Sequence, residues 1–290
     1  TTDALYLEDH QMAILKVGKK IKLRSIKDDL PKTPHILALQ LSLDQIEKGG
    51  YDHFMLKEIY EQPKAIQDTY RGRLRPEDGL IKMAGIDAHI DRFLKANRIV
   101  IVACGTSWHA GLVAEYIFEE LARIPVEVEY ASEFRYRNPI IGPNDIVIAI
   151  SQSGETADTL AALQKAKELG YLGYLAVCNV VNSSLVRESD ILISTNAGPE
   201  IGVASTKAFT TQITVLTMIA LKLAKVKGTI SQSDYRLHLR ELELIPSNVE
   251  MALKKNKDIE DIAGLFKDAT NFLYLGRGYN FPVALERSEE

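Results

Sequence analysis

From residue 98 onward, short apolar runs alternate with longer amphipathic segments. The apolar runs are rich in Ile and Val and show no polar alternation, which indicates strands that are buried on both faces of a sheet. Strands separated by helical segments are typical of a parallel sheet with helices on both sides. The sequence therefore predicts an α/β fold built on a doubly wound parallel sheet flanked by helices. The expected strands are 98–103, 126–130, 145–150, 174–178 and 190–194, and the expected helices between them are 107–122 and 157–169.

The segments on either side of this pattern differ from it. Residues 4–25 contain short alternating runs, which indicate small antiparallel strands, whereas 52–70 has a helical pattern. A second helical region is expected over 204–266, with breaks near Gly228 and Pro246.

An apolar run that leads into a glycine turn recurs toward the C-terminal end. Residues 271–278 can be aligned with 99–105 and their continuation. Such internal similarity predicts a second copy of one structural unit. We expect this copy to be truncated after a strand and part of a helix, which cannot form a core alone.

Length and charge restrict the classes of function. The chain has 290 residues, which suffices for two domains or one large one. Charged residues make up 26% of it, and the formal net charge is -4. We therefore expect no general electrostatic attraction to nucleic acid or to an anionic membrane. A phosphorylated ligand would have to be held by local contacts.

The two cysteines and the apolar helix suggest a compartment. Cys104 and Cys178 both end apolar runs and give no reason to propose a disulfide framework or a metal cluster. A reducing, cytoplasmic setting is expected. The longest apolar helix, around 209–223, is interrupted by threonines, Gln212 and Lys222, and no secretory signal precedes the first strand. The sequence therefore predicts no membrane span.

The first loop whose residues could bind a ligand is 104–107, where a buried strand meets the start of a helix. Gly105 allows close approach of a ligand to the backbone. Thr106 and Ser107 add hydroxyl groups beside the amides of a helix N-terminus, which favour an anion. The alternative is that Ser107 only caps its helix.

The second loop, 151–156, also joins a buried strand to a helix, and it carries more polar groups. Its sequence is Ser151-Gln152-Ser153-Gly154-Glu155-Thr156. Closely spaced hydroxyls, an amide and helix-start N–H groups can surround a phosphate without a lysine. Glu155 would repel a phosphate, so we expect it to point away and complement the positive end of a helix. The loop lacks the ending of a Walker motif, and neither loop has the glycine spacing of a dinucleotide fingerprint.

The third loop, 196–207, follows the strand at 191–194. Its glycines and proline predict an irregular backbone. Ser205 could cap the following helix or contact a sugar hydroxyl, and the cap is the expected single role. Lys207 is more often solvated or salt-bridged in such a place than bound to a phosphate.

Five ordered blocks resemble the sugar isomerase (SIS) domain of the glutamine–fructose-6-phosphate aminotransferase family, also called glucosamine-6-phosphate synthases. The resemblance extends to 47–51 and 53–59, which are similar to the segment that joins the family's glutaminase domain to its isomerase half. The blocks are 104–107, 133–137, 151–156, 183–190 and 200–212.

The resemblance implies a function and a set of roles. The family transfers ammonia from glutamine to fructose 6-phosphate and isomerises the product to glucosamine 6-phosphate, with neither a metal nor a pyridoxal cofactor in the isomerase half. The expected ligand is fructose 6-phosphate, glucose 6-phosphate or glucosamine 6-phosphate. The expected assembly is a homo-oligomer, at least a dimer, with no nucleic acid or membrane partner. The residues implied to hold the phosphate are Ser107, Ser151, Gln152, Ser153 and Thr156, and those implied to contact the sugar are Thr106, the Val203 backbone and Ser205.

The resemblance also implies a domain layout. Residues 1–26 would be a remnant of the glutaminase domain, and 27–50 an interdomain linker. The first sugar isomerase domain with its preceding helices would span 51–245. Residues 246–290 would hold a helical connection and the start of a second isomerase domain. On this layout the family's catalytic residues are absent from the chain, so we expect the isolated chain to be inactive, and Glu286, Glu289 and Glu290 are not expected to be catalytic bases.

Two other functions are compatible with the same loops. One is a stand-alone sugar-phosphate isomerase, and the other is a regulatory module that only binds a sugar phosphate. The joining segment at 47–59 argues against the first. Such regulatory modules usually adjoin a DNA-binding helix pair or another effector domain, and the sequence shows neither.

Overall fold

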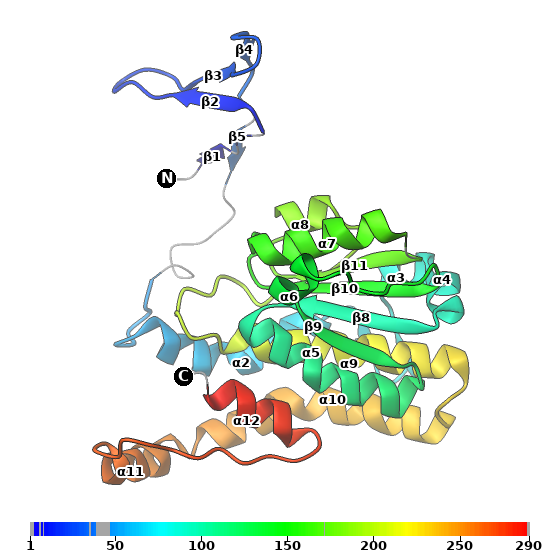
Figure 1. Ribbon diagram of the computed structural model, residues 1–290. Coiled ribbons are helices and arrows are strands. Elements are labelled where there is room, and N and C mark those ends of the chain that lie inside the picture. Colours follow the sequence, from blue (N-terminus) through cyan, green and yellow to red (C-terminus); the bar gives the residue numbers. More distant parts are fainter. Residues whose placement is uncertain are drawn as a thin grey trace. The chain divides into compact units, whose positions relative to one another are not determined.

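The computed structural model describes residues 3–5, 7, 9–34, 36–38, 47–170 and 172–288 (Figure 1). The chain divides into two compact units, Thr1–Gly49 and Gly50–Glu290. Each unit is described by itself.

The first unit consists of short antiparallel strands. β1 (Asp3–Leu5) pairs with β5 (Ile36–Ala38), and β3 (Lys22–Ser25) pairs with both β2 (Gln11–Ile14) and β4 (Pro31–Lys32). This confirms the antiparallel strands expected near the N-terminal end. β4 and β5 lie inside the segment interpreted as a linker, and residues 39–46 of that segment lie outside the described residues.

The second unit is built around a parallel sheet of five strands, as the apolar runs predict. Its spatial order is β12-β11-β10-β8-β9. The chain first adds β9 on one side of β8 and then continues with β10 on the other side, so the strand order reverses between β8 and β10. In sheets of this kind the crevice at that switch point is the usual place for a ligand. The strands are β8 (Arg98–Ala103), β9 (Val126–Tyr130), β10 (Asp145–Ser151), β11 (Gly173–Cys178) and β12 (Ile191–Ser194).

Helices cover both faces of the sheet because successive strand residues point to opposite sides. On one face, Val100, Val102 and Ala149 belong to a core shared with α6 (Ala131–Tyr136), α7 (Ala157–Leu169) and α8 (Ser184–Arg187). On the other face, the buried isoleucines of β8 and β10 pack with α5 (Gly105–Ile117) and α9 (Lys207–Lys227). Figure 1 shows α7 and α8 on one side of the sheet and α5 and α9 on the other.

Further elements complete the layer that contains α5 and α9. α2 (Phe54–Tyr70), the helix expected over 52–70, packs on α9 and on α10 (Gln232–Leu253). α5 continues into the π-helical turn η1 (Phe118–Ala122). The short elements between α2 and β8 are β6 (Leu74–Arg75), β7 (Leu80–Ile81), α3 (Ala84–Ala88) and α4 (Ile90–Lys95).

The helix break expected at Pro246 is wrong, because α10 passes through this residue. A proline removes one backbone hydrogen bond and crowds the carbonyl four residues earlier. Tyr235, Leu239, Leu242 and Pro246 are the buried residues of α10, and their spacing of three and four places them on one face. Packing of this stripe against α2 and α9 stabilises the continuous helix. The break near Gly228 is confirmed, since Gly228 ends α9 with φ +68°.

The C-terminal segment forms no strand where one is expected. Residues 271–277 have no regular secondary structure, and Leu273 and Leu275 are 82% and 83% exposed. A strand needs a neighbour for its backbone hydrogen bonds, and in the described part of the chain no strand pairs with this segment. Before it lies α11 (Asn256–Phe266), which has no buried residue, and after it α12 (Asn280–Ser288), which packs against α5.

Candidate functional site

The loops 104–107 and 151–156 lie next to each other at the switch point. β8 and β10 are paired in parallel, with Val102 opposite Ala149, so the loops that follow them emerge at the same edge of the sheet. The helices that follow the loops go to opposite faces, α5 to one and α7 to the other. In open sheets of this type, ligands usually bind where the connections diverge in this way.

In the first loop, the structure assigns Ser107 a role other than capping. Gly105 has φ +51° and begins α5, and the capping position is Cys104, which makes no side-chain cap bond. Ser107 is buried, and its Oγ accepts a hydrogen bond of 3.0 Å from Gln212 Nε2 of α9. A hydroxyl that accepts in this way keeps its own proton for another partner. Ser107 can therefore donate into the crevice.

The serine hydroxyls of the second loop also accept hydrogen bonds from within the loop. Ser151 Oγ accepts from the Gly154 amide at 2.9 Å, and Ser153 Oγ accepts from the Glu155 amide at 3.2 Å. Thr156 is the N-cap residue of α7 and makes no side-chain cap bond, and its hydroxyl lies 3.4 Å from Ser151 Oγ. The loop therefore presents hydroxyl protons beside the unpaired amides of a helix N-terminus, which is a suitable environment for an anion.

Gly154 is the residue on which this loop turns. Its φ of +68° is strained for any residue with a side chain. A Cβ at this position would lie 2.0 Å from Ser183 Oγ and 2.8 Å from Cys178 Sγ. The loop thus lies directly against the end of β11 and the start of α8.

Negative charge is kept out of the second loop. The Glu155 carboxylate accepts a 2.8 Å bond from the Ser184 amide at the start of α8, so it points to a helix end as expected, although the helix is α8 and not α7. Burial raises the pKa of the Cys178 thiol above its ordinary value, which keeps the group neutral at physiological pH. The thiol therefore adds no charge, and the Glu155 carboxylate is held against the start of α8.

In the third loop, the prediction that Ser205 caps the following helix is wrong. Ser205 Oγ donates to Glu200 Oε2 at 2.9 Å. Glu200 Oε1 accepts from the amides of Thr206 and Ala208 at 2.9 and 3.1 Å, so Glu200 provides the cap of α9. Val203, whose backbone is implied to contact the sugar, has an exposed side chain.

Lys207 is committed to an ion pair. Its side chain is only 4% exposed, and its Nζ lies 2.6 Å from the Glu61 carboxylate on α2. Of the two expected roles, solvated or salt-bridged, the structure shows the salt bridge. The three loops therefore hold their polar groups mainly through hydrogen bonds, without an uncompensated lysine among the described contacts.

Glu58 fixes the backbone of the third loop, a role that no sequence pattern indicates. Its carboxylate is buried on α2 and accepts bonds from the amides of Ile201 and Gly202. Loss of a hydrogen bond to a charged group costs about 1.5–3 kcal/mol. We expect Glu58→Ala to lower the free energy of unfolding by about this amount, measured by urea denaturation. Glu77→Ala, at an exposed position, should change it by less than about 0.5 kcal/mol. Equal effects of the two substitutions would contradict the role of Glu58.

Comparison with known proteins agrees with this geometry. Residues 92–222 match the SIS domain family. The chain is 54% identical over 286 residues, 99% of its length, to glutamine–fructose-6-phosphate aminotransferase [isomerizing] from Chlorobaculum tepidum, and 48% identical over 272 residues to the protein of that name from Escherichia coli K12. Residues 92–222 belong to the SIS domain family. This confirms the resemblance found in the sequence.

Solved structures support the same conclusion for the SIS domain. The C-terminal domain of glucosamine-fructose-6-phosphate aminotransferase from Francisella tularensis is similar with a TM-score of 0.78 and 47% identity, over 83% of this chain and 66% of that one. Glucosamine-6-phosphate deaminase from Thermotoga maritima shares the fold, with a TM-score of 0.59 and 21% identity over 81% of this chain and 65% of that one. The chain spans 46% of the Chlorobaculum protein and 42% of the Escherichia protein.

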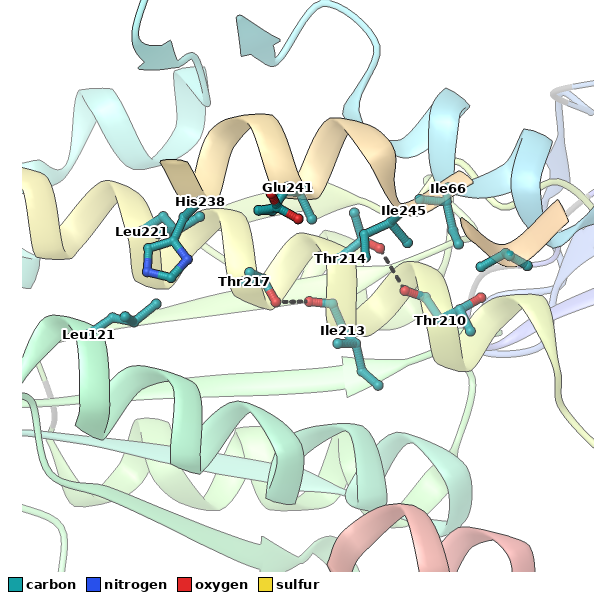
Figure 2. Close-up of a pocket in the computed structure, with 12 residues that line it drawn as sticks. Ile66, Leu121, Thr210, Ile213, Thr214, Thr217, Leu221, His238, Glu241 and Ile245 are labelled. Carbon is teal, nitrogen blue, oxygen red and sulfur yellow. Dashed lines mark hydrogen bonds between the residues drawn. The ribbon is translucent and has the colours of Figure 1, made fainter. Parts of the chain in front are cut away.

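A separate groove in the SIS domain does not suit a phosphate. It lies between α2, α9 and α10, with Thr210, Thr214 and Thr217 along α9 (Figure 2). These hydroxyls donate to carbonyls of their own helix, as the bonds from Thr214 to Thr210 and from Thr217 to Ile213 show. The rest of the lining is mainly aliphatic, with Glu241 and His238 as its ionisable groups. The loops at the strand ends are therefore the better candidate for binding an anion.

α9 itself is the core helix of the SIS domain. Among the described residues it is the one helix long and apolar enough to cross a membrane, and 61% of its most apolar window is buried. Its buried residues pack against α2, α5 and the sheet. Burial within the domain accounts for its apolar composition.

Proposed function

We propose that this chain is the sugar-phosphate-binding part of a glutamine–fructose-6-phosphate aminotransferase. The observation that carries the proposal is the hydrogen-bond direction at the switch point. Ser107 and Ser153 each accept a bond from within the domain and keep a proton to donate, and the hydroxyl pair of Ser151 and Thr156 keeps one proton between them. Three donors beside a helix N-terminus match the oxygens of a phosphate monoester.

The remaining roles follow from the same reasoning. Gln152 and Thr156 would complete the phosphate contacts from the second loop. Thr106, the Val203 backbone and Ser205 would contact the sugar. Ser205 would accept from a sugar hydroxyl because its proton goes to Glu200. The site would need no metal and no pyridoxal cofactor. The ligand would be fructose 6-phosphate, glucose 6-phosphate or glucosamine 6-phosphate.

The three loops are built for binding and lack the groups for proton transfer. Isomerisation needs an acid or base within hydrogen-bond reach of the sugar. The ionisable groups of these loops are engaged elsewhere: Glu155 with α8, Glu200 with the start of α9, and Lys207 with Glu61. We expect the chain by itself to bind fructose 6-phosphate without converting it.

Two measurements on the purified chain test this function. Calorimetric titration should show binding of glucose 6-phosphate and no comparable binding of glucose, because the phosphate contacts dominate. Incubation with fructose 6-phosphate and ammonia should yield no glucosamine 6-phosphate by mass spectrometry. Absence of glucose 6-phosphate binding would refute the site, and formation of product would refute the division between binding and catalysis.

The setting of the protein is part of the same proposal. We propose a cytoplasmic enzyme that works as a homo-oligomer, at least a dimer. Residues 1–26 would belong to a glutaminase domain, 27–50 to a linker and 51–245 to the first isomerase domain. Residues 246–290 would lead into a second one. Analytical ultracentrifugation of the chain at several concentrations would test the oligomeric state.

A further inference from the structure

A buried carboxylate joins the C-terminal helix to the first loop of the site. Glu286 of α12 has a side chain that is 7% exposed. Its Oε1 accepts a 2.8 Å hydrogen bond from the Thr106 hydroxyl, and its Oε2 lies 2.6 Å from His109 Nδ1. Thr106 and His109 are three residues apart on α5, so one carboxylate holds a full turn of this helix.

This contact determines what Thr106 can offer to a ligand. A hydroxyl has one proton and two lone pairs. Because the proton of Thr106 goes to Glu286, its oxygen can only accept further bonds. The neighbouring Ser107 is in the opposite state, since it accepts from Gln212 and keeps its proton. Two adjacent residues of one loop thus present opposite hydrogen-bond polarity.

We propose that Glu286 is a positioning residue that makes Thr106 an acceptor for a sugar hydroxyl. The proposal rests on the proposed function, because it assumes that Thr106 contacts the sugar. A sugar hydroxyl can donate to the lone pairs of Thr106, whereas a phosphate oxygen is repelled by them. Glu286 thereby orients the bound ligand, with the sugar at Thr106 and the phosphate at Ser107 and the second loop.

α12 has a second anchor that does not involve this carboxylate. The Tyr279 hydroxyl donates to Glu120, and the Tyr279 ring lies 5.6 Å from the ring of Tyr116. Pro282 is buried as well. A change confined to the Glu286 carboxylate should therefore leave α12 docked on α5. Tyr279→Phe is a matched control, because it removes the hydrogen bond to Glu120 and leaves the bond between Thr106 and Glu286 in place.

The test is the ratio of affinities for glucose 6-phosphate and inorganic phosphate, measured by calorimetry in the full chain. Glu286→Gln removes the negative charge and replaces one of the two acceptor oxygens with a donor, so no carboxylate fixes the Thr106 proton. We expect the ratio to fall about tenfold, the effect of losing one hydrogen bond. In a Thr106→Val background the same substitution should change nothing more. Tyr279→Phe should leave the ratio unaltered.

Three outcomes would overturn the inference. They are an unchanged ratio in Glu286→Gln, an equal loss for both ligands, and the same fall of the ratio in the Thr106→Val background. A wild-type chain that does not bind glucose 6-phosphate would overturn the proposed function as well, so the two failures are distinguishable.

A measurement on the unaltered chain removes any dependence on the folding of Glu286→Gln. Fluorine can accept weakly but cannot donate, so one deoxyfluoro analogue of glucose 6-phosphate should bind about tenfold more weakly than the parent sugar. The same analogue should show no such penalty in Thr106→Val. If every fluorinated position is tolerated, Thr106 does not act as an acceptor and the inference is wrong.

Discussion

Gly154→Ala is expected to abolish sugar-phosphate binding and to destabilise the SIS domain. The new Cβ would lie 2.0 Å from Oγ and 2.5 Å from Cβ of Ser183, which is buried and is the N-cap residue of α8. The residue would also have to keep φ +68°, which costs a side chain about 1–2 kcal/mol. Overpacking adds about 1–3 kcal/mol. We expect a loss of about 2–5 kcal/mol in the free energy of unfolding, together with displacement of the phosphate loop.

Gly170→Ala is the matched control. Gly170 has a similar φ of +75°, but a Cβ there would meet nothing within 4 Å. This substitution should lower the free energy of unfolding only by the cost of positive φ, about 1–2 kcal/mol, and should leave binding unchanged. Urea unfolding and calorimetric titration with glucose 6-phosphate measure both effects. If the two variants lose the same stability and both keep their affinity, then the close packing of Gly154 on Ser183 does not shape the site.

The sheet and the position of the two polar loops could be predicted because both depend on local sequence. A run such as Ile99–Val102 is apolar at every position, which is enough to predict a strand covered on both faces. Polar residues directly after two such runs then have to lie at the carboxyl edge of the sheet. The structure places loops 104–107 and 151–156 there, at the reversal of strand order.

The partners that orient the hydroxyls could not be predicted, because they come from distant parts of the chain. Gln212 reaches Ser107 across 105 positions, and Glu286 reaches Thr106 across 180. Periodicity carries no information on such pairs. One signal was present in the sequence: Gln212 is a polar residue in the apolar stretch of α9, where a buried amide needs a partner.

Two errors in secondary structure have a related cause, since tertiary packing decided them. Pro246 predicts a break by its local chemistry, but the buried stripe of α10 outweighs the lost hydrogen bond. Residues 271–277 have the composition of a strand, but strand formation depends on a neighbour that the described part of the chain does not supply. Ser205 was expected as a cap for a similar reason, because the chain could not show that Glu200 folds back onto the same amides.

Ser153 does not cap the helix that follows its loop. Thr156 occupies the N-cap position of α7, and Ser153 Oγ accepts from the Glu155 amide within the loop. Substitutions of Ser153 should therefore report on ligand binding more than on helix stability.

Ser153→Asp is accordingly expected to abolish sugar-phosphate binding while the domain stays folded. Its carboxylate can accept from the Glu155 amide as the serine does, but it brings a negative charge against the phosphate and has no proton to donate. Ser153→Ala removes only the donor, so affinity should fall about tenfold to hundredfold, from about 1.5–3 kcal/mol at about 1.4 kcal/mol per decade. Ser233→Asp, which adds the same charge at an exposed position in the first turn of α10, should bind normally. Melting temperatures and glucose 6-phosphate affinities of the three variants separate an effect on ligand binding from an effect on stability. Unchanged affinity in Ser153→Asp would place the phosphate elsewhere, because no anion tolerates a carboxylate in its own cradle of hydroxyl and amide donors.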